Sequence, residues 1–154
     1  FGKAFAVDVA AGAAHVLILG RQGEVFALGD NRRGQLGLGV LPDELPKADT
    51  LTRLSLPRRA TQVACGTAHS AVLLDDGSAF AFGDDHNLQL GLRDTSIKSL
   101  RHGAKYVCTP TRVELLGHPS DTRVISIAAG GGGIEGGHTA FVVDGKGGTQ
   151  LWLC

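Results

Sequence analysis

The sequence predicts an all-β fold built from repeated antiparallel sheets, and three observations support this prediction. The chain has 23 glycines among its 154 residues, but only five prolines and no methionine. Short apolar runs alternate with glycine-containing turns, a pattern typical of β-hairpins. One long stretch occurs twice and then begins a third time. Because repetition at a fixed spacing indicates a repeat architecture, each copy is expected to form one sheet.

The repeat is defined by "VDVAAGAAHVLILGRQGEVFALGDNRRGQLGLG", which aligns without a gap with "TQVACGTAHSAVLLDDGSAFAFGDDHNLQLGL". Aligned positions lie 54 residues apart, as Gly12 and Gly66 do. A third copy starts at "VISIAAGGGGIEGGH", with five inserted residues before its histidine. The structural repeat positions are Gly12, His15, Gly29 and Gly37 in the first unit, Gly66, His69, Gly83 and Gly91 in the second, and Gly130 and His138 in the third.

Each unit is expected to contain four strands. In the first unit "HVLILG" and "EVFALG" predict two strands joined at "RQG", and in the second "HSAVLLD" and "SAFAFGD" are joined at "DDG". Gly23 and Gly77 supply the positive φ that such hairpin turns require. A further strand is predicted at "LTRLSLP" and at "PTRVELLG". Four strands in a unit of roughly 50 residues are typical of one blade of a β-propeller.

The unit boundaries follow from these strands. Small residues in "VAAGAAH" and "VACGTAH" suit innermost strands, which converge on the crowded axis of a propeller. Units are predicted at about 7–57, 60–117 and 123–154, the last incomplete, and together form one partial β-propeller domain over residues 1–154. Cys154 is expected at the place of Gly29 and Gly83. The absence of methionine favours a piece of a longer protein.

The glycine-rich string "GDNRRGQLGLG", at 29–39, is predicted to be a structural corner. Phosphate-binding loops need G-x-x-x-x-G-K-[ST], or G-x-G-x-x-G between a strand and a helix, and neither spacing is present. The prolines of the following "VLPDELP" also prevent the helix that would supply N-terminal amides. No cofactor is therefore predicted.

Composition places the chain among ordinary globular proteins, with 43% hydrophobic residues and a formal net charge of zero. A neutral chain has no broad attraction to nucleic acids, so proteins are the favoured partners and nucleic acid is a less favoured one. No run of about 18 apolar residues predicts a membrane span. Three widely spaced cysteines, Cys65, Cys108 and Cys154, predict neither a disulfide framework nor a zinc site, and favour a reducing intracellular compartment.

The repeated motifs resemble those of a known family. The patterns V-x-V-A-x-G-x-x-H, D-G-x-[VA]-[YF]-x-x-G and G-Q-L-G-L-G are similar to the repeat of the regulator of chromosome condensation. The resemblance implies a seven-bladed β-propeller of four-stranded antiparallel blades, of which this chain holds about three successive units. Members of this family include an exchange factor for the small GTPase Ran, chromatin readers, domains of ubiquitin ligases, a plant photoreceptor and mitochondrial factors.

Departures from the family pattern narrow these functions. The resemblance to the Ran exchange factor implies acidic residues between the glycine and the histidine of several repeats. At these positions this chain has Ala13 and Ala14 in the first unit, and Thr67 and Ala68 in the second. The photoreceptor needs stacked tryptophans, and Trp152 is the single one here. The irregular third unit is more similar to the mitochondrial propellers than to the nuclear exchange factor.

The histidines that recur in the repeat are expected to be structural. His15 and His69 are predicted to be buried, each bonding a backbone carbonyl within its own blade. Cys65 and His69 have the i, i+4 spacing of a helical metal site, but they lie on a predicted strand and turn, so no metal site is predicted. Asp84, Asp85 and His86, in the corner loop of the second unit, are predicted to cap a turn rather than to hold a ligand. No catalytic residue is predicted.

The candidate partner-binding residues are basic side chains in two loops. A long insertion, "RDTSIKSLRHGAK" at 93–105, interrupts the second unit, and long loops on a rigid support are common binding elements. A solvated loop is the alternative interpretation. The predicted contacts to an acidic protein surface or a phosphate backbone are Arg32, Arg33, Arg93, Lys98, Arg101 and Lys105.

Two functions are therefore carried forward. The first is a non-enzymatic interaction or scaffold propeller within a larger protein or assembly, with a mitochondrial member of the family as the nearer resemblance. The alternative is a guanine-nucleotide exchange factor for a small Ran-like GTPase. The sequence leaves the mitochondrion, the nucleus and the cytoplasm open as compartments.

Overall fold

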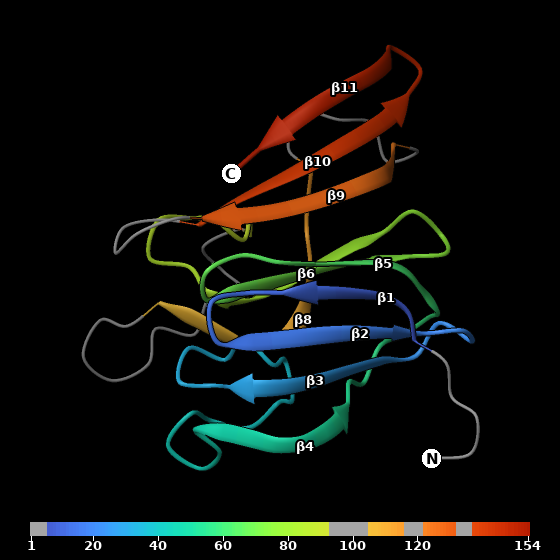
Figure 1. Ribbon diagram of the computed structural model, residues 1–154. Coiled ribbons are helices and arrows are strands. Elements are labelled where there is room, and N and C mark those ends of the chain that lie inside the picture. The colour runs from blue at the N-terminus through green and yellow to red at the C-terminus, as the bar shows by residue number, and fades with distance from the viewer. Residues whose placement is uncertain (1–5, 93–104, 116–121, 132–136) are drawn as a thin grey trace.

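The computed structural model describes residues 6–92, 105–115, 122–131 and 137–154, and every regular element among them is a β-strand. Figure 1 shows the strands as three antiparallel sheets that follow one another along the chain. The first sheet contains β1 (Ala6–Ala11), β2 (His15–Gly20), β3 (Val25–Asp30) and β4 (Lys47–Arg53). The second contains β5 (Ala60–Cys65), β6 (His69–Leu74), β7 (Ala79–Asp84) and β8 (Tyr106–Arg112). The third contains β9 (Arg123–Gly131), β10 (Gly137–Gly145) and β11 (Gly148–Leu153).

Each sheet has its strands in sequence order, with every neighbouring pair antiparallel. The predicted four-stranded antiparallel units are therefore confirmed for the first two copies, which we call blades 1 and 2. The third sheet is blade 3. Within the described ranges, no helix is long and apolar enough to cross a membrane.

The hairpins form where the glycine turns predict them. Gly23 and Gly77 have φ values of 81° and 80°, which residues with a Cβ rarely adopt. The amide of Gly23 donates to the carbonyl of Gly20 at 3.0 Å, and Gly77 makes the same bond to Leu74. These turns join β2 to β3 and β6 to β7, so the central strands of both blades follow from local sequence.

The hydrophobic cores lie between adjacent blades. Leu17 and Val25 of blade 1 pack with Val72 and Phe82 of blade 2, and a second cluster joins blade 2 to blade 3. Because blade 2 has a neighbour on each face, all six residues of β6 are buried, whereas β2 alternates between buried and partly buried positions. Each blade thus contributes a sheet face to its neighbour's core.

The two ends of the stack expose apolar side chains. Val7 and Val9 of β1 are exposed, and so are Leu151 and Leu153 of β11. The corresponding inner strand of blade 2 buries Val63 in the core. The stability of each blade therefore depends on contact with the next blade.

The predicted fourth strands are displaced along the chain. They were expected at 51–57 and 110–117, but β4 and β8 begin four residues earlier in each case. The strand that pairs with β3 is the polar segment "KADTLTR", with Asp30 opposite Lys47 and Phe26 opposite Arg53. An outer edge strand needs no apolar run, whereas the apolar Leu54 that suggested the strand follows it and packs into the core.

Blade 3 has a longer hairpin than the other two, and this moves the register of Cys154. Cys154 was expected at the position of Gly29 and Gly83, but it exchanges backbone hydrogen bonds with Thr139, as Phe82 pairs with Ser70 in blade 2. Trp152 lies opposite Phe141, with ring centroids 5.8 Å apart. The indole therefore helps to fill the space against blade 2.

Two of the glycines before the repeated histidines are required by close packing. A Cβ on Gly12 would overlap the ring of His15, and one on Gly66 would overlap the ring of His69. Gly130, the third copy, has nothing within 4 Å of its Cβ position. Crowding at this position therefore comes from the histidine and not from the axis alone.

We predict that Gly66→Val destabilises the intact protein by about 3 kcal/mol, because the side chain forces the buried His69 ring out of its place. Gly130→Ala is the matched control at the third repeat position and is expected to change stability by less than about 0.5 kcal/mol. Urea unfolding of the two variants measures the difference. Equal stability of both would contradict the packing role of the histidine ring.

The corner loop of blade 2 has a residue with a Cβ in the left-handed region. Leu88 has φ of 62°, where its counterpart Gly34 in blade 1 has 72°. A left-handed conformation costs a residue with a Cβ about 1–2 kcal/mol. The leucine side chain is 56% exposed, so burial does little to offset this cost.

We predict that Leu88→Gly stabilises the intact protein by about 0.5 kcal/mol, because relief of strain exceeds the added entropy of the unfolded chain. Asn87→Gly is the control. Asn87 does not have a positive φ, so glycine there relieves no strain and only raises the conformational entropy of the unfolded chain. Thermal unfolding should rank Leu88→Gly above the parent protein and Asn87→Gly below it. The reverse order would show that the loop carries no strain at Leu88.

Candidate functional site

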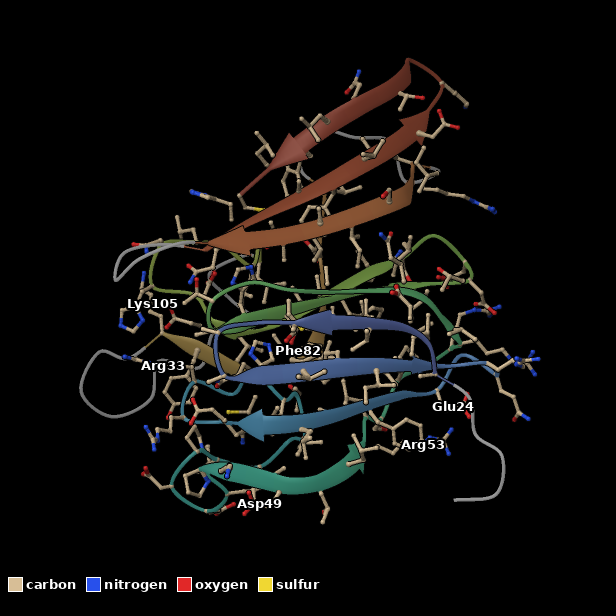
Figure 2. The ribbon with its side chains drawn as sticks, viewed as in Figure 1. Glu24, Arg33, Asp49, Arg53, Phe82 and Lys105 are labelled. Atoms are coloured by element: carbon tan, nitrogen blue, oxygen red, sulfur yellow. The ribbon has the colours of Figure 1, made fainter. Side chains whose placement is uncertain are left out.

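The blades present two different ends to the surroundings. One end, which we call the corner end, carries the turns before the repeated histidines and the corner loops at 31–40 and 85–92. The opposite end, the hairpin end, carries the β2–β3 and β6–β7 turns. Figure 2 shows Arg33 and Lys105 at the corner end, and Glu24 and Arg53 at the hairpin end.

His15 and His69 bond between blades and not within one, whereas the third repeated histidine, His138, is exposed. His15 Nε2 of blade 1 lies 2.9 Å from the hydroxyl of Ser70 in blade 2, and this hydroxyl donates to the carbonyl of Gln35 at 2.8 Å. The next interface repeats the arrangement. His69 Nε2 lies 3.0 Å from Thr139 Oγ1, which donates to the carbonyl of Gln89. The predicted direct bond from each histidine to a carbonyl of its own blade is therefore wrong. A hydroxyl group of the next blade lies between the histidine and the carbonyl.

The direction of the hydrogen bonds assigns the histidine tautomer. A hydroxyl has one hydrogen, and in Ser70 and Thr139 it is donated to a carbonyl. The imidazole of His15 and of His69 must therefore donate from Nε2–H. We call each set of histidine, hydroxyl and glutamine carbonyl an inter-blade bridge.

Burial keeps these rings neutral. Burial, followed by repulsion from His69, lowers the pKa of His15 from 6.5 to about 4, and burial also lowers the pKa of His69. Between about pH 6.5 and 4 the unfolded chain binds a proton that folded His15 excludes. The free energy of unfolding therefore falls as the pH falls through this window, and His15 costs no stability above it.

The bridge excludes a nucleophilic role for Ser70. Its hydroxyl lies within bonding distance of a histidine, as in a serine hydrolase, but the histidine donates the hydrogen bond and cannot accept the hydroxyl proton. Ser70 and His69 are fully buried, and His15 is 2% exposed. These side chains connect blades and do not reach a substrate.

The polar side chains of the corner loops form hydrogen bonds within the same loops. Asp84 accepts from Gln89 Nε2 at 2.8 Å and lies 2.7 Å from His86 Nδ1. Asp85 accepts from the amide of Leu90 at 3.0 Å. In blade 1 the same place is taken by Asn31, which accepts from the amide of Leu36. The turn-capping interpretation of this cluster is confirmed.

The other repeated glycines lie at close contacts. Gly29 and Gly83 lie beneath the turns that precede the histidines, where a Cβ would meet the carbonyls of Ala14 and Ala68. A Cβ on Gly37 would lie 2.7 Å from the ring of Phe82, and a Cβ on Gly91 would lie 2.7 Å from Cys154 Sγ. The corner loop of one blade thus packs onto the next blade along the chain.

Three of the six predicted partner-binding residues lie in the described part of the chain. Arg32 pairs loosely with Asp30 at 3.4 Å and keeps 79% of its side chain exposed, and Arg33 is exposed beside it. Lys105 is half-buried, and its carbonyl accepts from the amide of Asp85 at 2.9 Å. The structure brings these three to the corner end. Arg93, Lys98 and Arg101 lie outside the described residues.

The hydroxyl partners of the histidines were missed from sequence. Ser70 and Thr139 each follow a repeated histidine directly, which is a signal that comparison of the copies could have supplied. The first unit has Val16 at this position, so the pattern is incomplete. Cys65, also singled out, is a buried free thiol that lies 3.4 Å from the carbonyl of Ala10. No group of three or more potential metal ligands occurs among the described residues.

We predict that Ser70→Ala destabilises the intact protein by about 2 kcal/mol, because it leaves the His15 Nε2–H and the Gln35 carbonyl buried without a partner. Ser70→Thr is the control, since Thr139 makes the same bridge in the next interface. Denaturant unfolding should place Ser70→Thr close to the parent. Equal losses for alanine and threonine would contradict the bridge.

Comparison with known proteins agrees with this geometry. The family model "Regulator of chromosome condensation (RCC1) repeat" matches residues 22–73 and 76–134, and a second model of the same description matches 6–35 and 60–89. The Drosophila melanogaster protein "Regulator of chromosome condensation" is 37% identical over 56% of this chain and 16% of its own length. The rat protein "Probable E3 ubiquitin-protein ligase HERC4" is 39% identical over 66% of this chain and 10% of its own. The chain thus spans less than a fifth of these relatives.

Solved structures show the same fold. Two crystal structures of yeast RCC1 match with TM-scores of 0.74 and 0.70, at 25% and 26% identity, and each covers 89% of this chain. The match covers 30% and 31% of those longer chains. The sheets described above are therefore successive blades of a β-propeller, as predicted. The chain belongs to the regulator of chromosome condensation (RCC1) repeat family.

Proposed function

We propose that this chain is part of a non-enzymatic interaction propeller that holds a protein partner or a large assembly at its corner end. The inter-blade bridges support this proposal most directly. In both bridges the histidine and the hydroxyl group connect one blade to the next. The corner loops are therefore attached to rigid sheets. Arg32 and Arg33 extend from such a loop into solvent, and loops fixed on a rigid scaffold are the usual location of binding residues.

A place within a larger protein fits the comparisons. The match covers a tenth of the rat relative, which is named a probable E3 ubiquitin-protein ligase. The matched region is therefore a small part of that longer chain. We propose the same arrangement here, with the propeller as the interaction part.

An exchange factor for a Ran-like GTPase is the second candidate. Its support is the likeness to yeast RCC1, one structure of which was described together with its binding to Gsp1p and histones. Such a factor opens the nucleotide pocket of the GTPase and performs no chemistry of its own. Ala13 and Ala14, with Thr67 and Ala68, leave the corner-end turns of blades 1 and 2 without acidic residues. Acidic residues in other blades are therefore a requirement of this alternative.

We propose a reducing intracellular compartment. The thiols of Cys65, Cys108 and Cys154 are free, and burial raises the pKa of Cys65 and of Cys154 to about 11. The longer hairpin of blade 3 is the feature that favours a mitochondrial member of the family. Within the cell we therefore propose a mitochondrial location.

Replacement of Arg93, Lys98, Arg101 and Lys105 with serine is predicted to weaken the complex with the native partner and to flatten its salt dependence. The physical reason is the loss of positive charges that attract an acidic surface or a phosphate backbone. Thermal stability of the intact protein is expected to stay within about 1 kcal/mol. Affinity for the partner copurified from the native cells is measured at several salt concentrations.

The control for this experiment keeps the charge. Arg93→Lys with Arg101→Lys should retain the affinity and its salt dependence. An unchanged salt titration for the serine variant would show that the insertion is only solvated, and would contradict the proposed contact.

A further inference from the structure

The outer edge of blade 1 carries unpaired backbone groups. β4 is the last strand of its sheet, and among the described strands it pairs with β3 alone (Figure 1). The amide of Leu54 donates to the carbonyl of Val25 at 2.9 Å, and the amide of Asn31 donates to that of Pro46 at 2.8 Å. The even-numbered residues at both ends of β4 therefore point their backbone groups toward β3. Because direction alternates along a strand, the odd-numbered residues of 47–53 point theirs away from the sheet.

The irregularity within β4 preserves this alternation. Ala48 lies opposite Gly29 and Thr52 lies opposite Ala27, so residues 49–51 face the single residue between Ala27 and Gly29. A bulge of this size leaves Ala48 and Thr52 both directed toward β3. The amides and carbonyls of the residues next to them remain directed outward.

Blade 2 has the same edge position closed by a proline. The amide of Val113 donates to the carbonyl of Ala79 at 2.9 Å, as Leu54 does in blade 1. Counting back along β8, Pro110 is an outward residue, and proline has no amide hydrogen to give to an added strand. Blade 1 has Leu51 at this place. Of the two four-stranded blades, only blade 1 can thus extend its sheet here.

The outward residues of β4 also share one face of the sheet, and their side chains are complementary in charge. Asp49 pairs with Lys47 at 2.6 Å through one carboxylate oxygen and keeps 76% of its side chain exposed. Arg53 is exposed and makes no ion pair with any described residue. Leu51, half-buried, lies between them in the strand. Figure 2 shows Asp49 and Arg53 on β4.

A second copy of this edge matches it in one register. When two β4 strands run antiparallel with Leu51 opposite Leu51, each Asp49 lies opposite Arg53 of the other copy. The outward amides and carbonyls of these residues then face each other across the edge. A slip in one direction would place Lys47 opposite Arg53, and a slip in the other would place Asp49 opposite the neutral Ser55. Like charges opposed across strands are unfavourable, so the charge order selects the first register.

We propose that two copies of this protein associate through their β4 edges in this antiparallel register, with a two-fold axis at Leu51. Backbone hydrogen bonds join the two blades into one continuous sheet, and the Asp49 and Arg53 pairs fix the register. The dimer goes beyond the proposed interaction function, because it presents two corner ends to the same partner or assembly. Two linked contact surfaces bind a repeated target more tightly than one does.

Complementary charge reversal tests this register in the intact protein. A dimer of Asp49→Arg would oppose two guanidinium groups at each pair, and a dimer of Arg53→Asp would oppose two carboxylates. Each variant alone should therefore dimerise about tenfold more weakly than the parent. An equimolar mixture restores both opposite-charge pairs, so heterodimers should form with the affinity of the parent. Sedimentation velocity with a different fluorescent label on each variant measures this.

The control variants use the comparison with blade 2. Arg112→Asp changes the matching arginine of β8 and should alter dimerisation by less than about twofold. Leu51→Pro copies the residue of blade 2 and removes the central amide, so it should abolish the dimer while thermal unfolding stays close to that of the parent. Leu51→Cys should form an intermolecular disulfide on mild oxidation, since directly opposed residues of this kind lie about 5.5 Å apart at Cα. Pro110→Cys should not.

Several outcomes would overturn the edge-to-edge dimer. A parent protein that remains monomeric at its highest soluble concentration would do so, as would a mixture no more dimeric than either charge variant alone. Equal losses for Arg53→Asp and Arg112→Asp would indicate unspecific charge attraction. If the parent is monomeric and Leu51→Pro instead loses the native partner, a strand of that partner occupies the edge. Native-partner binding that persists in monomeric Leu51→Pro leaves the corner-end function standing whether or not the parent dimerises.

Discussion

The inter-blade bridge is the constraint on which the rest of this structure depends. Each bridge joins a histidine of one blade to a hydroxyl of the next blade, and returns through that hydroxyl to a glutamine carbonyl of the first. The histidine and hydroxyl side chains of the bridge are buried, so loss of a partner for Nε2 or the hydroxyl would cost more than the bond itself contributes. The bridge therefore favours one register of each blade against the next.

The bridge also connects the core to the corner loops. Gln35 supplies the carbonyl of the bridge through its backbone, while its side chain donates to Asp30 at 2.8 Å and accepts from the amide of Arg33. Gln89 makes the same set of contacts in blade 2. A displacement of one blade against the next would thus disturb the loop that carries Arg32 and Arg33. Rigidity of the interface and presentation of the loops have one physical origin.

The repeated scaffold leaves variation to the two ends of the blades. The two described interfaces keep the same chemistry, with the hydroxyl of Ser70 in one and that of Thr139 in the other. Surface positions change, as Ser55 and Glu114 do at the hairpin end. Such changes alter charge without affecting blade packing, so one architecture can offer different partners a different surface at each blade.

The local features of the fold could be predicted from sequence because their causes are local. The repeat, the central strands of each blade and the turns at Gly23 and Gly77 depend on alternating apolar residues and on residues that tolerate positive φ. The outer strands were misplaced because a polar edge strand such as β4 has no periodic apolar signal, and the apolar Leu54 beside it gave a false one.

What the tertiary structure decided is the set of partners that lie far apart in the chain. His15 and Ser70 are separated by 55 residues, so no pattern within a short window of sequence brings them together. The tautomer of His15 and its lowered pKa are equally products of burial between blades. The sequence alone determined the blades, because each hairpin is specified by neighbouring residues. Only packing of one blade on the next determined which side chains connect them and which remain free to bind.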